Sequence, residues 1–209
     1  MHISEGVLSA PVIVVGWGAA VAGIGVGLKK TAAAKLPETA LVSAVLFLAS
    51  LVHIPLGPSS IHLTLLGLAG ILLGWSAVPA LFIALLLQSI LFQFGGLLSL
   101  GVNTTVMGTA ALSAFGVWRL LPTGKGRPPE RAIAAGVKPA AAFISGFVAV
   151  GTGTFLVTFS LFLSSRDLFS TAVLMFAANL PLAVVEGVIT AFSVLFLQRM
   201  MPRYVFGPA

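Results

Sequence analysis

Long apolar stretches alternate along the chain with short segments that contain glycine, proline or charged residues. Between Glu38 and Arg119, 80 consecutive residues include no Asp, Glu, Lys or Arg. Runs of this kind are typical of helices that cross a lipid bilayer, each of which needs about 20 residues. We predict seven helices, of which the third is short for a span, at residues 8–28, 37–52, 63–74, 78–94, 98–117, 139–163 and 168–197.

The composition agrees with lipid as the solvent. Hydrophobic residues make up 58% of the 209 residues and charged residues 8%, whereas soluble domains are about 25% charged. The sequence therefore predicts an all-α integral membrane protein with one transmembrane domain over residues 1–209, and no room for a globular nucleotide-binding domain. The absence of cysteine excludes disulfides and thiolate metal sites.

The distribution of basic residues predicts the orientation. With the amino terminus outside, only Arg166 lies in an outer loop. The cytoplasmic loops then hold ten basic residues: Lys29, Lys30, Lys35, Arg119, Lys125, Arg127, Arg131, Lys138, Arg199 and Arg203. Because cytoplasmic loops are enriched in Lys and Arg, we predict seven spans with the amino terminus outside and the carboxyl terminus in the cytoplasm. No basic residue precedes the first apolar run, so we expect no cleaved signal peptide and a mature chain that begins at Met1.

This topology places all three histidines, His2, His53 and His62, at the outer face. A free terminal amine followed by histidine is a chelator: the Met1 amine, the His2 amide nitrogen and the His2 Nδ1 can bind one metal in a plane. A fourth nitrogen, from His62 or His53, would complete a square. Planar nitrogen sites suit Ni(II), Cu(II) or low-spin Co(II), whereas Zn(II) prefers a tetrahedron. The alternative is that these histidines are structural, with hydrogen bonds to the backbone.

Three segments resemble the CbiM/NikM family, the nickel/cobalt-specific substrate-binding components of energy-coupling-factor importers. The opening is typical of that family, as are a histidine after a Gly/Ser-rich segment and a Gly-Gly-Leu stretch that leads to Asn. The segments are Met1-His2-Ile3-Ser4-Glu5-Gly6, Gly57-Pro58-Ser59-Ser60-Ile61-His62-Leu63 and Gly95-Gly96-Leu97 with Leu100-Gly101-Val102-Asn103. This chain has Ile61-His62-Leu63 where many relatives have Ser-His-Pro.

The resemblance implies a seven-helix metal-binding subunit in a prokaryotic inner membrane. It implies that nickel or cobalt is the transported substrate, with Met1, His2 and, by motif match, His62 as ligands; no organic cofactor is implied. The expected partners are a transmembrane coupling protein, cytoplasmic ATPases and a small accessory membrane subunit.

Several polar residues are candidates to support the ligands. Glu5 would accept a hydrogen bond from the His2 ring, or would be a solvated carboxylate near the start of a helix. Asn103, Ser59 and Ser60 would orient His62, or would cap helices.

Two further features lie inside the predicted spans. Ala19, Gly23 and Gly27 form a ridge of small residues, which either docks the coupling partner or packs against another helix of the same chain. Apart from Glu38 at the start of the second span, Glu186 is the only formal charge within a predicted span, and it lies about 28 Å of ideal helix below Asp167. We expect it to be too deep for the metal site unless Pro181 bends the helix sharply. It is either functional, as acids within membranes often are, or a buried hydrogen-bonded or protonated acid at a helix interface.

The chain has no machinery for ATP hydrolysis. Gly124-Lys125-Gly126 lacks the spacing and the Ser/Thr of a phosphate-binding loop, so an ATPase would be another polypeptide. A stand-alone secondary transporter or channel is the main alternative; it should have acids or histidines along a path, and only Glu186 qualifies. A metal-dependent membrane enzyme would need an open coordination position, which four planar nitrogens do not leave.

Overall fold

The described part of the chain is almost entirely helical. The computed structural model describes residues 3–51, 53–56, 59–121, 137–165 and 169–200. In these lie α1 (Ala10–Lys30), α2 (Leu36–Ala49), α3 (Leu66–Leu73), α4 (Ala77–Phe92), α5 (Leu100–Leu120), α7 (Val137–Ser164) and α8 (Phe169–Met200). Two 3-10 turns, η1 (Ala33–Lys35) and η2 (Gly74–Ser76), and two strands, β1 (His53–Leu56) and β2 (Ser59–His62), connect them. Each predicted helical stretch overlaps one of these helices.

Five helical segments of the described residues are long and apolar enough to cross a bilayer. They are Ala10–Lys30, Leu66–Phe92, Leu100–Leu120, Pro139–Ser164 and Val173–Met200, the second of which joins α3, η2 and α4. Many large apolar side chains face outward, for example Val15 at 71% and Leu120 at 86% exposure, as expected where lipid is the solvent. The class, an all-helical multi-pass membrane protein, is confirmed. The count of seven spans and the orientation of the two ends stay predictions.

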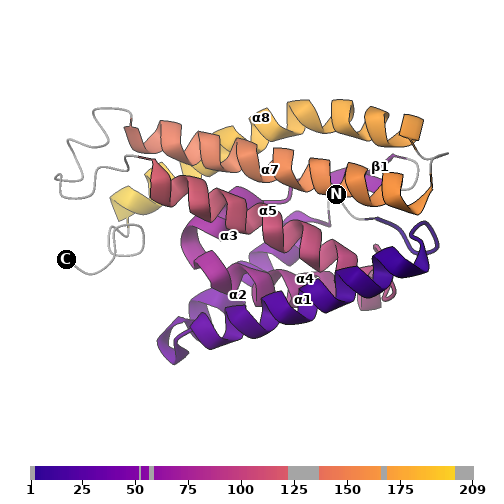
Figure 1. Ribbon diagram of the computed structural model, residues 1–209. Helices are drawn as coiled ribbons and strands as arrows, with labels where there is room; N and C mark the ends of the chain where they lie inside the picture. The colour runs from indigo at the N-terminus through magenta and orange to yellow at the C-terminus, as the bar shows by residue number, and fades with distance from the viewer. Residues whose placement is uncertain (1–2, 52, 57–58, 122–136, 166–168, 201–209) are drawn as a thin grey trace.

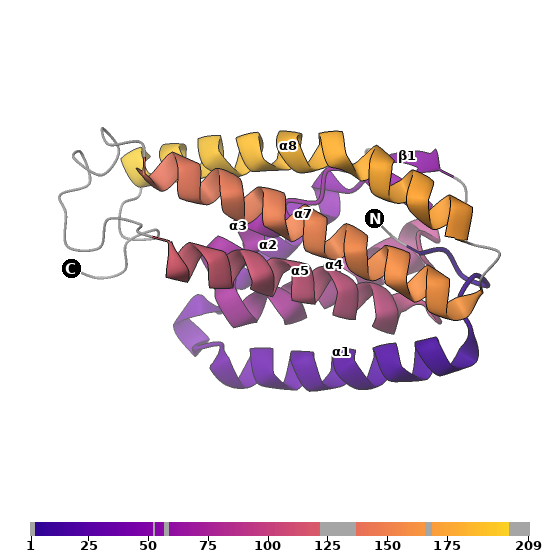
Figure 2. The ribbon, with the colours of Figure 1, turned by 45° about the horizontal axis from the view of Figure 1, so that its top comes forward.

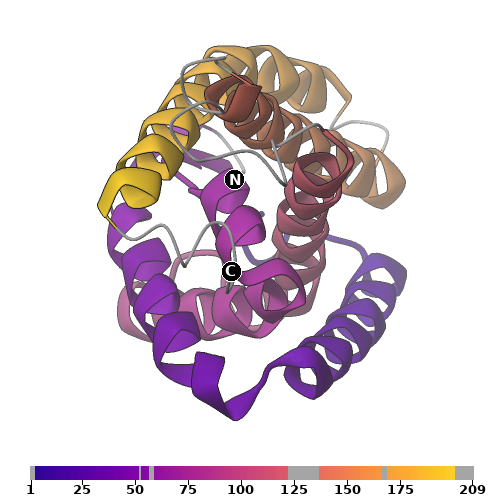
Figure 3. The same cartoon turned by 90° about the vertical axis from the view of Figure 1, so that its left-hand side faces the viewer.

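The long helices lie roughly side by side, as Figures 1 and 2 show. Helix α7 packs along α5 and α8, while α1 packs along α5 and α4. Viewed from the end, α1 and α8 lie on opposite sides of the bundle (Figure 3). Helix α3 is the most enclosed: six of its eight residues are buried, and it contacts α5, α7 and α8.

The segment between α2 and α3 differs from the expected loop. Strands β1 and β2 form an antiparallel hairpin in which His53 is the backbone partner of His62, and Leu56 that of Ser59. This pairing satisfies peptide groups that no helix satisfies here. Helix α3 begins at Leu66 instead of residue 63, because Leu65 has a φ of +52°, in the left-handed region that a right-handed helix cannot contain.

Glycines bring α3, α7 and α8 into direct backbone contact. A Cβ added to Gly146 of α7 would lie 2.7 Å from the Thr190 Oγ1 and 3.0 Å from the Gly187 Cα of α8. A Cβ added to Gly67 of α3 would meet the backbone of Gly146 and would lie 3.0 Å from the same Thr190 Oγ1. Small residues at a helix interface allow this approach, so the three backbones are held together at one level of the bundle.

We expect Gly146→Ala to destabilise the protein. The added methyl group overpacks the contact with α8, at a cost of about 1–3 kcal/mol. Gly151→Ala is the matched control in the same helix, because a Cβ there meets no atom within 4 Å. Thermal unfolding of the detergent-purified variants measures the difference, and equal melting temperatures would contradict the close packing.

Candidate functional site

The Asn103 side chain of α5 binds the backbone of the segment that follows the proposed chelating residues. The Ile3 backbone N–H donates to the Asn103 Oδ1 at 2.9 Å, and the Asn103 Nδ2 donates to the Ile3 carbonyl oxygen at 3.1 Å. Ile3 is fully buried and Asn103 is 2% exposed. A primary amide both donates and accepts, so it can bind a peptide group in the way a neighbouring strand would. Asn103 therefore fixes the position of Ile3.

Glu5 adds a second attachment, to the connection between α4 and α5. Its Oε1 accepts a hydrogen bond from the Leu98 N–H at 3.1 Å. The carboxylate lies over Gly96, whose φ is +85° and where a Cβ would be 2.6 Å from the Glu5 Cβ. Only glycine allows both that backbone conformation and this approach. The Gly-Gly-Leu stretch and the opening hexapeptide are thus two sides of one contact.

The structure gives both residues partners that the sequence did not predict. Asn103 donates to Ile3 and, at 3.5 Å, to the Ser99 Oγ, so it binds the amino-terminal segment, and its predicted role of orienting His62 stays a prediction. The predicted contact between Glu5 and the His2 ring is untested, because Met1 and His2 lie outside the described residues.

His62 ends β2 and is 3% exposed. Its Nδ1 lies 3.0 Å from the Leu63 carbonyl oxygen. Since a carbonyl only accepts, Nδ1 carries the ring proton and the lone pair is on Nε2. A neutral imidazole with its lone pair on Nε2 is the form that binds a metal ion.

Glu186 binds the Leu63–Thr64 and Thr64–Leu65 peptide groups, which follow His62 closely in the chain. The buried carboxylate accepts hydrogen bonds from the Thr64 N–H, from the Thr64 hydroxyl at 2.8 Å and from the Leu65 N–H at 2.9 Å. The described hydrogen bonds of Glu186 thus go to residues two and three positions after His62. No sequence pattern pointed to Thr64, because this contact joins residues 122 positions apart.

The other predicted residues are only partly placed. For His53, Ser59 and Ser60 the structure describes the backbone but not the side chains, and Gly124-Lys125-Gly126 lies outside the described residues. Within the described residues no group of three or more His, Cys, Asp or Glu side chains could hold a metal ion. The predicted ligand set includes Met1 and His2, which lie outside the described residues, so this absence does not contradict it.

The predicted docking ridge lies mainly against α4. A Cβ at Gly27 would meet the Pro79 Cδ and the Trp75 carbonyl oxygen, and one at Gly23 would lie 3.3 Å from the Val78 Cγ1. Ala19 is exposed. These contacts favour packing within the chain for Gly23 and Gly27, while partner docking on the ridge stays a prediction.

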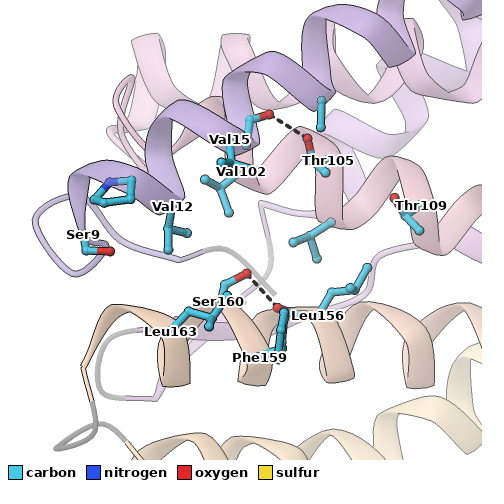
Figure 4. Close-up of a pocket in the computed structure, with 14 residues that line it drawn as sticks. Ser9, Val12, Val15, Val102, Thr105, Thr109, Leu156, Phe159, Ser160 and Leu163 are labelled. Carbon is cyan, nitrogen blue, oxygen red and sulfur yellow. Dashed lines mark hydrogen bonds between the residues drawn. The ribbon is translucent and has the colours of Figure 1, made fainter.

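A hydrophobic groove of about 500 Å³ lies between α1, α5 and α7 (Figure 4). Two of its four hydroxyl groups donate to helix carbonyls: the Thr105 Oγ1 to that of Gly16 and the Ser160 Oγ to that of Leu156, each at 2.8 Å. Among the described residues, no histidine or carboxylate lines the groove. It is therefore unsuited to a cation.

Known proteins of similar sequence and fold are metal transporters. The family model of the cobalt uptake substrate-specific transmembrane region, CbiM, matches residues 2–204. A provisionally named metal transport protein of Haemophilus influenzae is 38% identical over 97% of this chain and 96% of its own length. The cobalt transport protein CbiM of Geobacter sulfurreducens is 33% identical over 97% of this chain and 60% of its own length. The crystal structure of a truncated transition metal transporter matches with a TM-score of 0.79 and 26% identity, over 95% of this chain and 99% of that one.

We expect Asn103→Ala to release the amino-terminal segment. The Ile3 N–H and carbonyl lose their partners, and leaving such buried groups unsatisfied costs about 1–3 kcal/mol each. Hydrogen exchange at residues 3–8 should become faster than in the wild type. Ser113→Ala, which removes a hydroxyl that bonds only within α5, is the control and should leave this exchange unchanged. Unchanged protection in the Asn103 variant would contradict the assigned role.

Proposed function

Because the chain belongs to the CbiM family of cobalt-uptake, substrate-specific transmembrane proteins, we propose that it captures Ni(II) or Co(II) for an energy-coupling-factor importer. A role in metal uptake follows from the family and from the transition metal transporter of the same fold. The binding site, the ion and the coupling to an ATPase are our proposals.

We propose a planar site of four nitrogens: the Met1 amine, the His2 amide nitrogen, the His2 Nδ1 and the His62 Nε2. The observation that carries this assignment is the pair of hydrogen bonds between Ile3 and Asn103, which holds the residue directly after His2 within the bundle. The placement of the His62 proton on Nδ1 also supports it, since Nε2 then has the lone pair.

The proposed donor set selects among cations by geometry. Four nitrogens in a plane suit Ni(II) and low-spin Co(II), and would also accept Cu(II), whereas Zn(II) would need a tetrahedral arrangement. The site carries no thiolate, because the sequence has no cysteine. The fixed geometry disfavours Zn(II), and we propose Ni(II) or Co(II) as the transported substrate.

We propose that a transmembrane coupling protein, cytoplasmic ATPase subunits and a small accessory membrane subunit complete the importer in a prokaryotic inner membrane. The sequence has no phosphate-binding loop of its own. The alternative, a stand-alone secondary transporter, relied on Glu186 as part of a path through the bilayer. The hydrogen bonds of this carboxylate to Thr64 and Leu65 favour a structural role for it.

We expect an extension ahead of Met1 to abolish metal binding. Converting the terminal amine into an amide removes one of the four donors and blocks the chelate. Metal analysis of the purified protein should give one Ni or Co per chain with a free terminus and none with one added residue. Equal metal content would refute terminal chelation. Gradient-driven metal uptake into liposomes by the purified chain alone would favour the secondary transporter.

The two candidates for the fourth ligand are separated by a pair of matched variants. His62→Ala should lose bound Ni or Co, and His53→Ala, whose backbone pairs with that of His62, should retain it. The same metal analysis provides the measurement. Loss of metal in the His53 variant alone would reverse the assignment.

A further inference from the structure

A buried carboxylate of α8 lies behind the proposed ligand His62. Glu186 has no exposed surface, and its side chain accepts hydrogen bonds from two successive backbone N–H groups and one hydroxyl. It is the only charged residue within the apolar body of a predicted span. An ionised group at such a depth is costly unless it is fully hydrogen-bonded, so its position calls for a reason.

The start of α3 explains part of this arrangement. Leu65 is left-handed and the helix begins at Leu66, so no helical carbonyl accepts from the N–H groups of Thr64 and Leu65. Within a bilayer no water replaces such a partner. The carboxylate accepts both N–H groups and lies at the positive end of the helix, where negative charge is favoured. This contact determines where the chain between β2 and α3 runs.

A single peptide group, Leu63–Thr64, connects Glu186 to the ring of His62. The Thr64 N–H, which donates to Glu186, belongs to the same peptide unit as the Leu63 carbonyl, which accepts from the His62 Nδ1. Two hydrogen bonds therefore meet on opposite ends of one amide. Hydrogen bonds in such a chain polarise one another, so a carboxylate on the N–H makes the carbonyl a stronger acceptor.

We propose that Glu186 is the positioning carboxylate of His62 and acts through the Leu63–Thr64 peptide group. Metal-binding histidines commonly donate their other ring N–H to a carboxylate or a carbonyl, which fixes the ring and raises the basicity of the ligand nitrogen. Here a carbonyl and a carboxylate act together. The Leu63 carbonyl orients the His62 ring, and the Glu186 carboxylate, bound to the N–H of the same peptide group, holds and polarises that carbonyl. The inference rests on the proposed function, because it assigns His62 to the metal.

The test is Glu186→Gln in the full-length protein with a free amino terminus. The amide has one acceptor oxygen in place of two and carries no charge, so we expect Ni(II) affinity to fall about 10- to 100-fold, as for other losses behind a ligand histidine. The visible absorption of the bound Ni(II) should also shift, a change that a loss of stability alone would not cause. Wild-type affinity together with an unshifted spectrum would overturn the proposal.

A control variant separates this role from stability. Thr190 lies on the same helix as Glu186, and its buried hydroxyl has no hydrogen-bond partner among the described residues. Thr190→Val should therefore leave Ni(II) binding unchanged. A loss in Thr190→Val as large as in Glu186→Gln would show that the effect comes from disturbed packing of α8 and not from the carboxylate.

A measurement on the wild-type protein keeps the proposal falsifiable if Glu186→Gln does not fold. In metal-free protein with ¹⁵N-labelled histidine, the His62 signals, assigned by their absence in His62→Ala, should show a proton on Nδ1. A proton on Nε2 instead would overturn the proposal. Failure of the wild type to bind Ni(II), or binding by His62→Ala, would instead refute the proposed function.

Discussion

Lipid cannot hydrogen-bond a peptide group, and this constraint governs every part of the chain that enters the bundle without being helical. Two such parts exist in the described residues: the amino-terminal segment at Ile3 and the segment between β2 and α3. Each is satisfied by one polar side chain from a long helix, Asn103 of α5 and Glu186 of α8. In both cases the side chain binds backbone, so the contact sets the path of the chain.

The same two contacts hold the segments beside the proposed ligands. Ile3 directly follows His2, and Thr64 is two residues beyond His62, so both attachments lie next to proposed ligands in the sequence. A site whose ligands are ordered before the ion arrives does not spend binding energy on ordering them. In the proposed site such ordering would also resist rearrangement to a tetrahedron, which is the basis on which we propose selection of Ni(II) or Co(II) over Zn(II).

Hydropathy was sufficient to predict the helices, because a long apolar run in a chain with few charges is typical of a helix that crosses a bilayer. It could not predict that α3 starts late, since that depends on the backbone of Leu65 and on a carboxylate 121 positions away. The opening hexapeptide and His62 were recognisable as motifs, and Asn103 and Glu5 were identified as supporting residues. Their partners, Ile3 and Leu98, were not predictable, because each contact spans more than 90 residues and forms only in the folded bundle.

The estimate of depth for Glu186 did not include the path of the chain after His62. It measured α8 from its outer end and concluded that the residue lies below the metal site. That reasoning assumed that His62 stays at the surface with the outer loop. The chain after His62 reaches α8, and α3 starts there, so the carboxylate contacts the segment that directly follows the proposed ligand.

The packing beside Glu186 bears on how a captured cation would leave. Gly146 of α7 approaches the Glu186 carbonyl oxygen and the Gly187 Cα so closely that an added Cβ would lie 3.0 Å from each. Among the described residues, α3, α7 and α8 are therefore in backbone contact beside the proposed site, with no room for a hydrated ion to pass between them. Release between these helices would require them to separate. In the importer that we propose, partner ATPase subunits would supply the energy for that motion, because the sequence has no phosphate-binding loop.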